Sequence, residues 1–144
     1  MALSSTYGNQ SGIGAPTPSG IPGFNAFVGV VGGSATLSTS SPSLPSWLNV
    51  ITVNATTNGA IMLPPAYAGD QVVVINNGAQ SATIYGNYVG NSTTLNDTIA
   101  AHTTTTQVTT GIAVATGAIE VFFCMQGQSG NTNNPTAGQW KALL

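Results

Sequence analysis

Residues 118–126 read Ala-Ile-Glu-Val-Phe-Phe-Cys-Met-Gln, and this stretch decides the fold class. Successive side chains of a β-strand point to opposite faces. One face carries Ile119, Val121, Phe123 and Met125, and the other carries Glu120, Phe122, Cys124 and Gln126. We expect the first face to be the core face because it is entirely apolar. The second is mixed, and a strand with apolar residues on both faces lies inside a sandwich or against another subunit. Both possibilities stay open.

Outward from this stretch, short segments of the same kind fill the chain from Trp47 onward. They are rich in Val, Ile, Thr and aromatic residues, and turn signals such as Asn58-Gly59 separate them. The expected strands are residues 48–53, 60–63, 71–76, 82–85, 104–109, 112–115, 118–126 and 139–144. No window of helical length shows a 3.6-residue apolar period. This spacing predicts an all-β fold, either a sandwich or a jelly-roll-like domain.

The first 25 residues have a different composition. Pro16, Pro18 and Pro22 are interspersed with glycine and serine, which disfavours a helix and leaves too little apolar surface to pack alone. Two interpretations stay open: a disordered tail, or an extended arm that becomes ordered along a neighbouring subunit. The anchors of such an arm would be Ile13, Ile21, Phe24 and Phe27. We therefore divide the chain into an arm, residues 1–25, and a β-sandwich domain, residues 26–144.

The chain is almost uncharged. Charged residues make up 3% of it, whereas an ordinary soluble domain is about 25% charged. The formal net charge of -2 provides no basic surface for phosphates or anionic lipids, so we expect neither nucleic-acid nor membrane-surface binding. A surface hydrated by Ser, Thr, Asn and Gln can be buried in contacts without desolvating charges. The composition therefore favours a structural protein over an enzyme.

No segment predicts export or membrane insertion. The N-terminus lacks the basic start and the apolar stretch of a secretory signal. The longest apolar runs, such as residues 121–125, are far shorter than the roughly 20 residues that span a bilayer. We expect synthesis in a cytosol.

The residues that could carry chemistry are few and scattered. A zinc site needs three or four ligands, and the chain offers His102, Cys124 and three carboxylates. Cys124 lies in an apolar run, which indicates a buried, inert thiol. Asp70 follows Ala68-Gly69, where its carboxylate can bond turn amides, and Asp97 follows Asn96 in a polar turn. We expect no catalytic site, no metal and no cofactor.

One electrostatic pair is worth predicting. If the strand 139–144 lies beside the strand 118–126, Lys141 and Glu120 can meet across the two strands. An exposed pair of this kind contributes roughly 0–1 kcal/mol.

The stretch 59–78 carries a family resemblance. It reads Gly-Ala-Ile-Met-Leu-Pro-Pro-Ala-Tyr-Ala-Gly-Asp-Gln-Val-Val-Val-Ile-Asn-Asn-Gly. An apolar strand ending in Leu-Pro, a short Ala/Gly turn and a Val-rich strand ending in Asn-x-Gly resemble a motif of small structural proteins of tailed bacteriophages. Similar pieces follow in order at residues 82–86, 96–99, 117–124 and 138–144. The resemblance covers about residues 59–144 and implies a β-rich virion component that brings no catalytic residues.

Together, the resemblance, the small size and the scarce charge predict a capsid decoration (cement) protein on the virion surface. Such a protein is made in the host cytoplasm, binds the major capsid protein and, as we expect here, forms a homotrimer. An alternative is a receptor- or glycan-binding module of a tail or head fibre. Its stacking aromatics would be Trp47, Tyr67, Tyr85 and Tyr88. A tail-tube or neck component is a third possibility, and residues 1–58 lie outside the resemblance, which leaves the attachment point open.

Overall fold

The computed structural model describes residues 26–31, 34–44, 48–53, 57–131 and 134–144, and these ranges contain strands and connecting segments but no helix. The fold of the described residues is therefore all-β, as predicted. The strands are β1 (Ala26–Val31), β2 (Leu48–Val53), β3 (Gly59–Met62), β4 (Gln71–Asn76), β5 (Ala82–Tyr85), β6 (Thr98–Ala100), β7 (Gln107–Val108), β8 (Ile112–Val114), β9 (Ile119–Gln126), β10 (Ser129–Asn131), β11 (Asn134–Thr136) and β12 (Gln139–Ala142).

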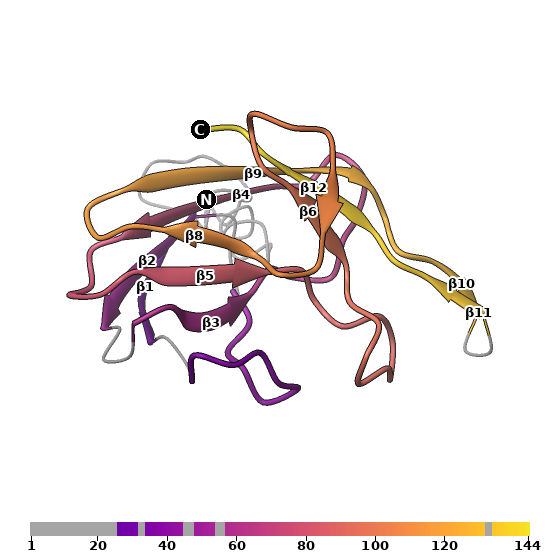
Figure 1. The fold of residues 1–144 in the computed structure, drawn as a ribbon, viewed down its shortest axis with the longest axis horizontal. Coiled ribbons are helices and arrows are strands. Elements are labelled where there is room, and N and C mark those ends of the chain that lie inside the picture. The colour runs from indigo at the N-terminus through magenta and orange to yellow at the C-terminus, as the bar shows by residue number, and fades with distance from the viewer. Residues whose placement is uncertain (1–25, 32–33, 45–47, 54–56, 132–133) are drawn as a thin grey trace, which may run out of the picture.

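The larger sheet has seven strands in the order β1-β2-β4-β9-β12-β6-β7 (Figure 1). Its centre, β4-β9-β12, is antiparallel, and β9 is its longest strand. The pairs β1–β2, β2–β4 and β12–β6 are parallel. The stretch 118–126, which forms β9, therefore lies in the middle of the sheet.

A second sheet has three strands in the order β3-β5-β8. A separate two-stranded hairpin, β10–β11, follows β9 and extends away from one end of the molecule (Figure 1). The loop between β5 and β6 lies at this same end. These connections, and not the sheet centres, carry most of the polar side chains discussed below.

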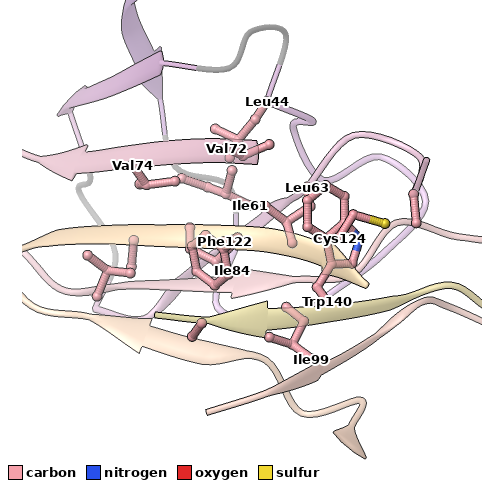
Figure 2. Packing of buried hydrophobic residues seen from close by; sticks show 14 of the residues in the cluster. Leu44, Ile61, Leu63, Val72, Val74, Ile84, Ile99, Phe122, Cys124 and Trp140 are labelled. Atoms are coloured by element: carbon pink, nitrogen blue, oxygen red, sulfur yellow. The ribbon is translucent and has the colours of Figure 1, made fainter. Parts of the chain in front are cut away.

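One hydrophobic core draws its side chains from both sheets (Figure 2). The larger sheet supplies Val72 and Val74 from β4, Phe122 and Cys124 from β9, and Trp140 from β12. The three-stranded sheet supplies Ile61, Ile84 and Val114. Each aliphatic or phenyl side chain that is removed from water here contributes roughly 1.5–3 kcal/mol. The shared core holds the two sheets together.

Most predicted strands are confirmed. The predicted bounds of β2, β4 and β5 agree with the structure, and those of β3, β8, β9 and β12 differ by up to two residues. The predicted strand 104–109 shortens to β7, because Thr104–Thr106 form a turn in which Thr106 N–H bonds the Thr104 hydroxyl at 3.0 Å. Strand β1 was not predicted, and neither were the three-residue strands β6, β10 and β11, which are too short to show a clear alternation.

The predicted core face of β9 is wrong. Phe122 and Cys124 are completely buried, whereas Ile119 and Met125 are 53% and 46% exposed. The register explains the reversal, because Phe122 lies opposite Val72 of β4 and Cys124 lies opposite Trp140 of β12. The entirely apolar face of β9 is the one that points away from the core.

Candidate functional site

The first candidate site is the outer surface of the larger sheet. Val121 lies opposite Val73, and Ile119 lies opposite Ile75, so each pair shares the outer side of β9 and β4. Leu143 N–H bonds the Val121 carbonyl at 2.8 Å, which continues the surface past β12. We call this surface the outer face and define it by Val73, Ile75, Ile119, Val121, Phe123, Met125 and Leu143. These side chains are half-buried or exposed, and all are apolar.

The cation nearest to the outer face, Lys141, is held by hydrogen bonds to backbone oxygens. Lys141 lies opposite Phe123, and its ammonium donates hydrogen bonds to the carbonyls of Ala101 at 2.6 Å, His102 at 3.1 Å and Thr104. The loop that follows β6 therefore holds the ammonium group. An approaching apolar surface would not have to strip water from a free charge on β12.

The predicted Lys141–Glu120 pair is wrong, although β12 and β9 do pair. Glu120 lies on the inner face of β9, opposite Val74, while Lys141 points to the other side. Glu120 Oε1 instead accepts hydrogen bonds from Val121 N–H at 3.1 Å and Leu144 N–H at 2.9 Å.

The second candidate site begins at a buried carboxylate. Asp97 was predicted to lie in a polar turn, but it is completely buried. Its Oδ1 accepts from Gly138 N–H at 2.7 Å, and its Oδ2 accepts from Gln128 Nε2 at 2.9 Å and Ala66 N–H at 3.3 Å. We call this arrangement the Asp97 junction: Asp97, Ala66, Gln128 and Gly138. It ties together four connections that are distant in the sequence: those between β3 and β4, β5 and β6, β9 and β10, and β11 and β12.

The junction is electrostatically costly. Burial raises the pKa of Asp97 above its ordinary value of 3.8, and the hydrogen bonds from Gln128, Gly138 and Ala66 oppose the rise. The nearby Trp140 indole N–H also lowers the pKa of Asp97, but by less than the other donors. Among the described residues this N–H has no partner at hydrogen-bond geometry. The carboxylate is thus held by neutral donors, without a cation.

Two glycines allow the chain to close around Asp97. A Cβ at Gly86 would lie 2.1 Å from the Asp97 carbonyl oxygen, and a Cβ at Gly138 would lie 2.3 Å from the Ala66 Cβ. Real Cβ atoms do not approach so closely, so any larger residue must displace backbone. Gly86 and Gly138 are therefore as much a part of this region as the carboxylate itself.

An open cavity of about 640 Å³ lies beside the junction. The loop after β5 forms one wall, and Gln128 with the β10–β11 hairpin forms the other. The lining residues are Val89, Gly90, Asn91, Ser92, Gln128, Ser129, Gly130 and Pro135. Among the described residues, the cavity thus has an uncharged lining that mixes polar and apolar groups.

The residues considered for catalysis do not come together. His102 is exposed in the loop held by Lys141, and in the described part of the chain no three His, Cys, Asp or Glu side chains form a group that could hold a metal ion. Cys124 is fully buried, as predicted, and burial raises the pKa of its thiol to about 11. A thiol of this pKa is almost entirely protonated at neutral pH.

The predicted partner-binding residues are only partly placed. Ile13, Ile21 and Phe24 lie outside the described residues. Phe27 belongs to β1, where it lies opposite Asn49 of β2, and is therefore part of the sheet's backbone ladder.

The predicted stacking aromatics do not form a cluster at the cavity. Tyr67 is 68% exposed, whereas Tyr85 and Tyr88 are half-buried, and none of the three lines the cavity. Trp47 lies outside the described residues. The sequence analysis did not identify Gln128, Asn91 and Ser92 as residues that line a cavity. The only feature of the sequence that could have indicated them is their position in polar connecting segments.

No protein-family model matches this sequence, and neither a curated protein nor a solved structure matches it. Among the described residues, no helix has both the length and the apolar character needed to cross a membrane.

Proposed function

We propose that this protein is a structural component of a tailed-bacteriophage virion, a capsid decoration (cement) protein that binds the major capsid protein. The observation that carries the proposal is the apolar outer face. Side chains such as Ile119, Met125 and Leu143 are 46–53% exposed at the surface of the larger sheet. Contiguous exposed apolar surface of this kind marks interaction sites in soluble proteins.

The charge distribution supports a structural contact. The outer face carries no charged member, and the ammonium of Lys141 is bound to carbonyls at its border. Burying such a face gains apolar free energy without the desolvation cost of ions. A contact of standard size, about 800 Å² on each partner, repeated in a homotrimer, would add avidity across neighbouring capsid subunits.

The architecture that we propose is a β-sandwich. The two sheets that share one core support it. Parallel pairing of β1–β2, β2–β4 and β3–β5 favours a sandwich over a jelly roll, whose strands are antiparallel.

Quantitative mass spectrometry of purified virions tests the location. We expect a copy number close to that of the major capsid protein. Absence from the particle contradicts the proposal, and a few copies per particle point instead to the tail, the neck or a fibre.

Rebinding to capsids from which the protein has been stripped tests the outer face. Ile119→Glu places a charge on this face and should reduce occupancy at least tenfold. Ala113→Glu is the matched control, because Ala113 is exposed on β8 of the other sheet. Equal occupancy of the two variants would contradict the assignment of this face.

A fibre module that binds a receptor or glycan is the second candidate. The observation in its favour is the neutral cavity at the hairpin end. It differs from the first in location and copy number, which the same mass-spectrometry measurement separates.

A further inference from the structure

We propose that the cavity between the loop after β5 and the β10–β11 hairpin is a binding site for an uncharged sugar. This inference does not depend on where the protein sits on a particle. It also concerns a different end of the molecule from the outer face, so the two can fail separately.

The lining supplies hydrogen-bonding groups of the required kind. Asn91, Ser92, Gln128 and Ser129 line the cavity. Amide and hydroxyl side chains both donate and accept hydrogen bonds, as does each hydroxyl of a sugar ring. The cavity is also lined by Val89, which is buried, and by Pro135, whose half-buried ring offers apolar surface to the C–H groups of a sugar. This mixture of a few polar groups with apolar contacts is typical of small-molecule sites.

Gln128 is oriented before any ligand arrives. Its Nε2 donates to Asp97 Oδ2 at 2.9 Å and to the Tyr88 carbonyl at 3.4 Å. Because the amide nitrogen is held by the buried junction, the amide oxygen is fixed as an acceptor without loss of further side-chain freedom on binding. Gln128 is thus a positioned recognition group, and Asp97 acts through it.

The backbone keeps the cavity open. Gly90 lines it with a φ of +56°, and a Cβ built there would meet nothing within 4 Å. Gly130, with a φ of +89°, lets β10 approach β11 closely, since a Cβ there would lie 2.1 Å from the Asn134 carbonyl oxygen. The opening at Gly90 is therefore free space next to the polar side chains and not a packing contact.

The absence of charge selects the ligand class. Among the described residues, the lining has no Lys, Arg, His, Asp or Glu. A phosphate, a carboxylate or an ammonium would lose its hydration there without gaining an opposite charge. A volume of about 640 Å³ has room for one or two pyranose rings. An uncharged monosaccharide, or the two terminal sugars of an uncharged glycan, matches the cavity in size, in polarity and in charge.

The test is saturation-transfer-difference NMR on the full-length chain. The probes are the methyl glycosides of glucose, galactose and mannose, and N-acetylglucosamine, with glucuronic acid and N-acetylneuraminic acid as charged comparisons. We expect a saturable signal from at least one neutral sugar and none from the acidic sugars. No signal from any neutral sugar at millimolar concentration overturns the proposal.

Variants locate the binding. Ser129→Trp fills the cavity and should abolish the signal, whereas Ala79→Trp, at an exposed position in the turn after β4, should not. Asn91→Ala should weaken binding about fivefold, as expected for one lost hydrogen bond, and Asn77→Ala is its matched control in the same distant turn. Retention of full binding by Ser129→Trp would overturn the assignment to this cavity. Thermal unfolding of each variant verifies that it is folded.

Discussion

The Asp97 junction and the outer face distribute polarity in opposite ways. At the junction a carboxylate is completely buried, and three neutral donors surround it. At the outer face, apolar side chains such as Ile119 and Met125 are about half exposed. Each region reverses the usual rule that charge lies outside and hydrocarbon inside.

The two reversals have different physical meanings. A buried charge is tolerated only where its hydrogen bonds compensate for desolvation, so the Asp97 junction must be rigid to exist. Exposed hydrocarbon needs no compensation inside the molecule, but it gains free energy when a partner covers it. We infer that the junction stabilises the fold and orients Gln128, and that the outer face serves association. Substitutions can separate the two roles.

Of the substitutions in these two regions, Asp97→Ala should have the largest effect. The substitution leaves three donors, including Gly138 N–H and Gln128 Nε2, without their acceptor in a buried site. At about 1–3 kcal/mol for an unsatisfied buried group, we expect a loss of about 4 kcal/mol in the free energy of unfolding, measured with urea. Asp70→Ala is the control, because Asp70 is exposed. Similar losses in both variants would contradict a special role for the junction.

Gly86→Ala should cost about 3 kcal/mol. The added Cβ would lie 2.1 Å from the Asp97 carbonyl oxygen, so backbone must move in a well-packed region. The control Gly117→Ala introduces strain at a φ of +78° but meets no atom within 4 Å, and should cost about 1 kcal/mol. Unfolding of both variants with urea compares the cost of a steric clash at Gly86 with the cost of backbone strain at Gly117. Equal losses in the free energy of unfolding would contradict the packing argument.

The pH dependence of stability should carry the signature of Asp97. Because the folded pKa is raised, the folded state binds more protons than the unfolded state between pH 3.8 and the folded pKa. The contribution of Asp97 to stability is therefore greatest below pH 3.8 and falls as pH rises through the folded pKa. Asp97→Asn cannot titrate, so the difference between its unfolding free energy and that of the original chain should change with pH in this window. A constant difference would contradict the raised pKa.

The sequence predicts the strands better than it predicts their faces. Alternation and turn residues locate β2, β4, β5 and β9, because these signals are local. Which face of β9 is buried depends on what lies above the sheet, and that is decided by the distant strands β3, β5 and β8. Phe122 and Cys124 lie on the mixed face of β9, yet they share the core with Trp140 and the smaller sheet. A local pattern carries no information about such a choice.

The candidate sites show the same limit. Asp97 looks like a turn residue, because Asn96 precedes it and polar residues are common around it. Its burial results from Gly138 and Ala66, which are 41 and 31 residues away in the sequence. The cavity likewise forms between residues 89–92 on one side and residues 128–130 with Pro135 on the other, and neither side has a distinctive motif. The scarcity of charge was the one global property that pointed to neutral surfaces.

The smallest effect on stability is expected at the outer face, and it isolates association from folding. Ile119→Thr keeps a β-branched side chain on β9 and removes apolar surface that is already 53% exposed, so the free energy of unfolding should change by about 0.5 kcal/mol or less. Phe122→Ala, on the inner face of the same strand, should cost about 3–5 kcal/mol because it empties a fully buried site. If the outer face is an interaction surface, Ile119→Thr should nevertheless lower self-association in analytical ultracentrifugation or occupancy on capsids. If Ile119→Thr instead loses as much stability as Phe122→Ala, the outer face is covered within the folded chain. The assignment of association to the outer face and of fold stabilisation to the Asp97 junction would then be wrong.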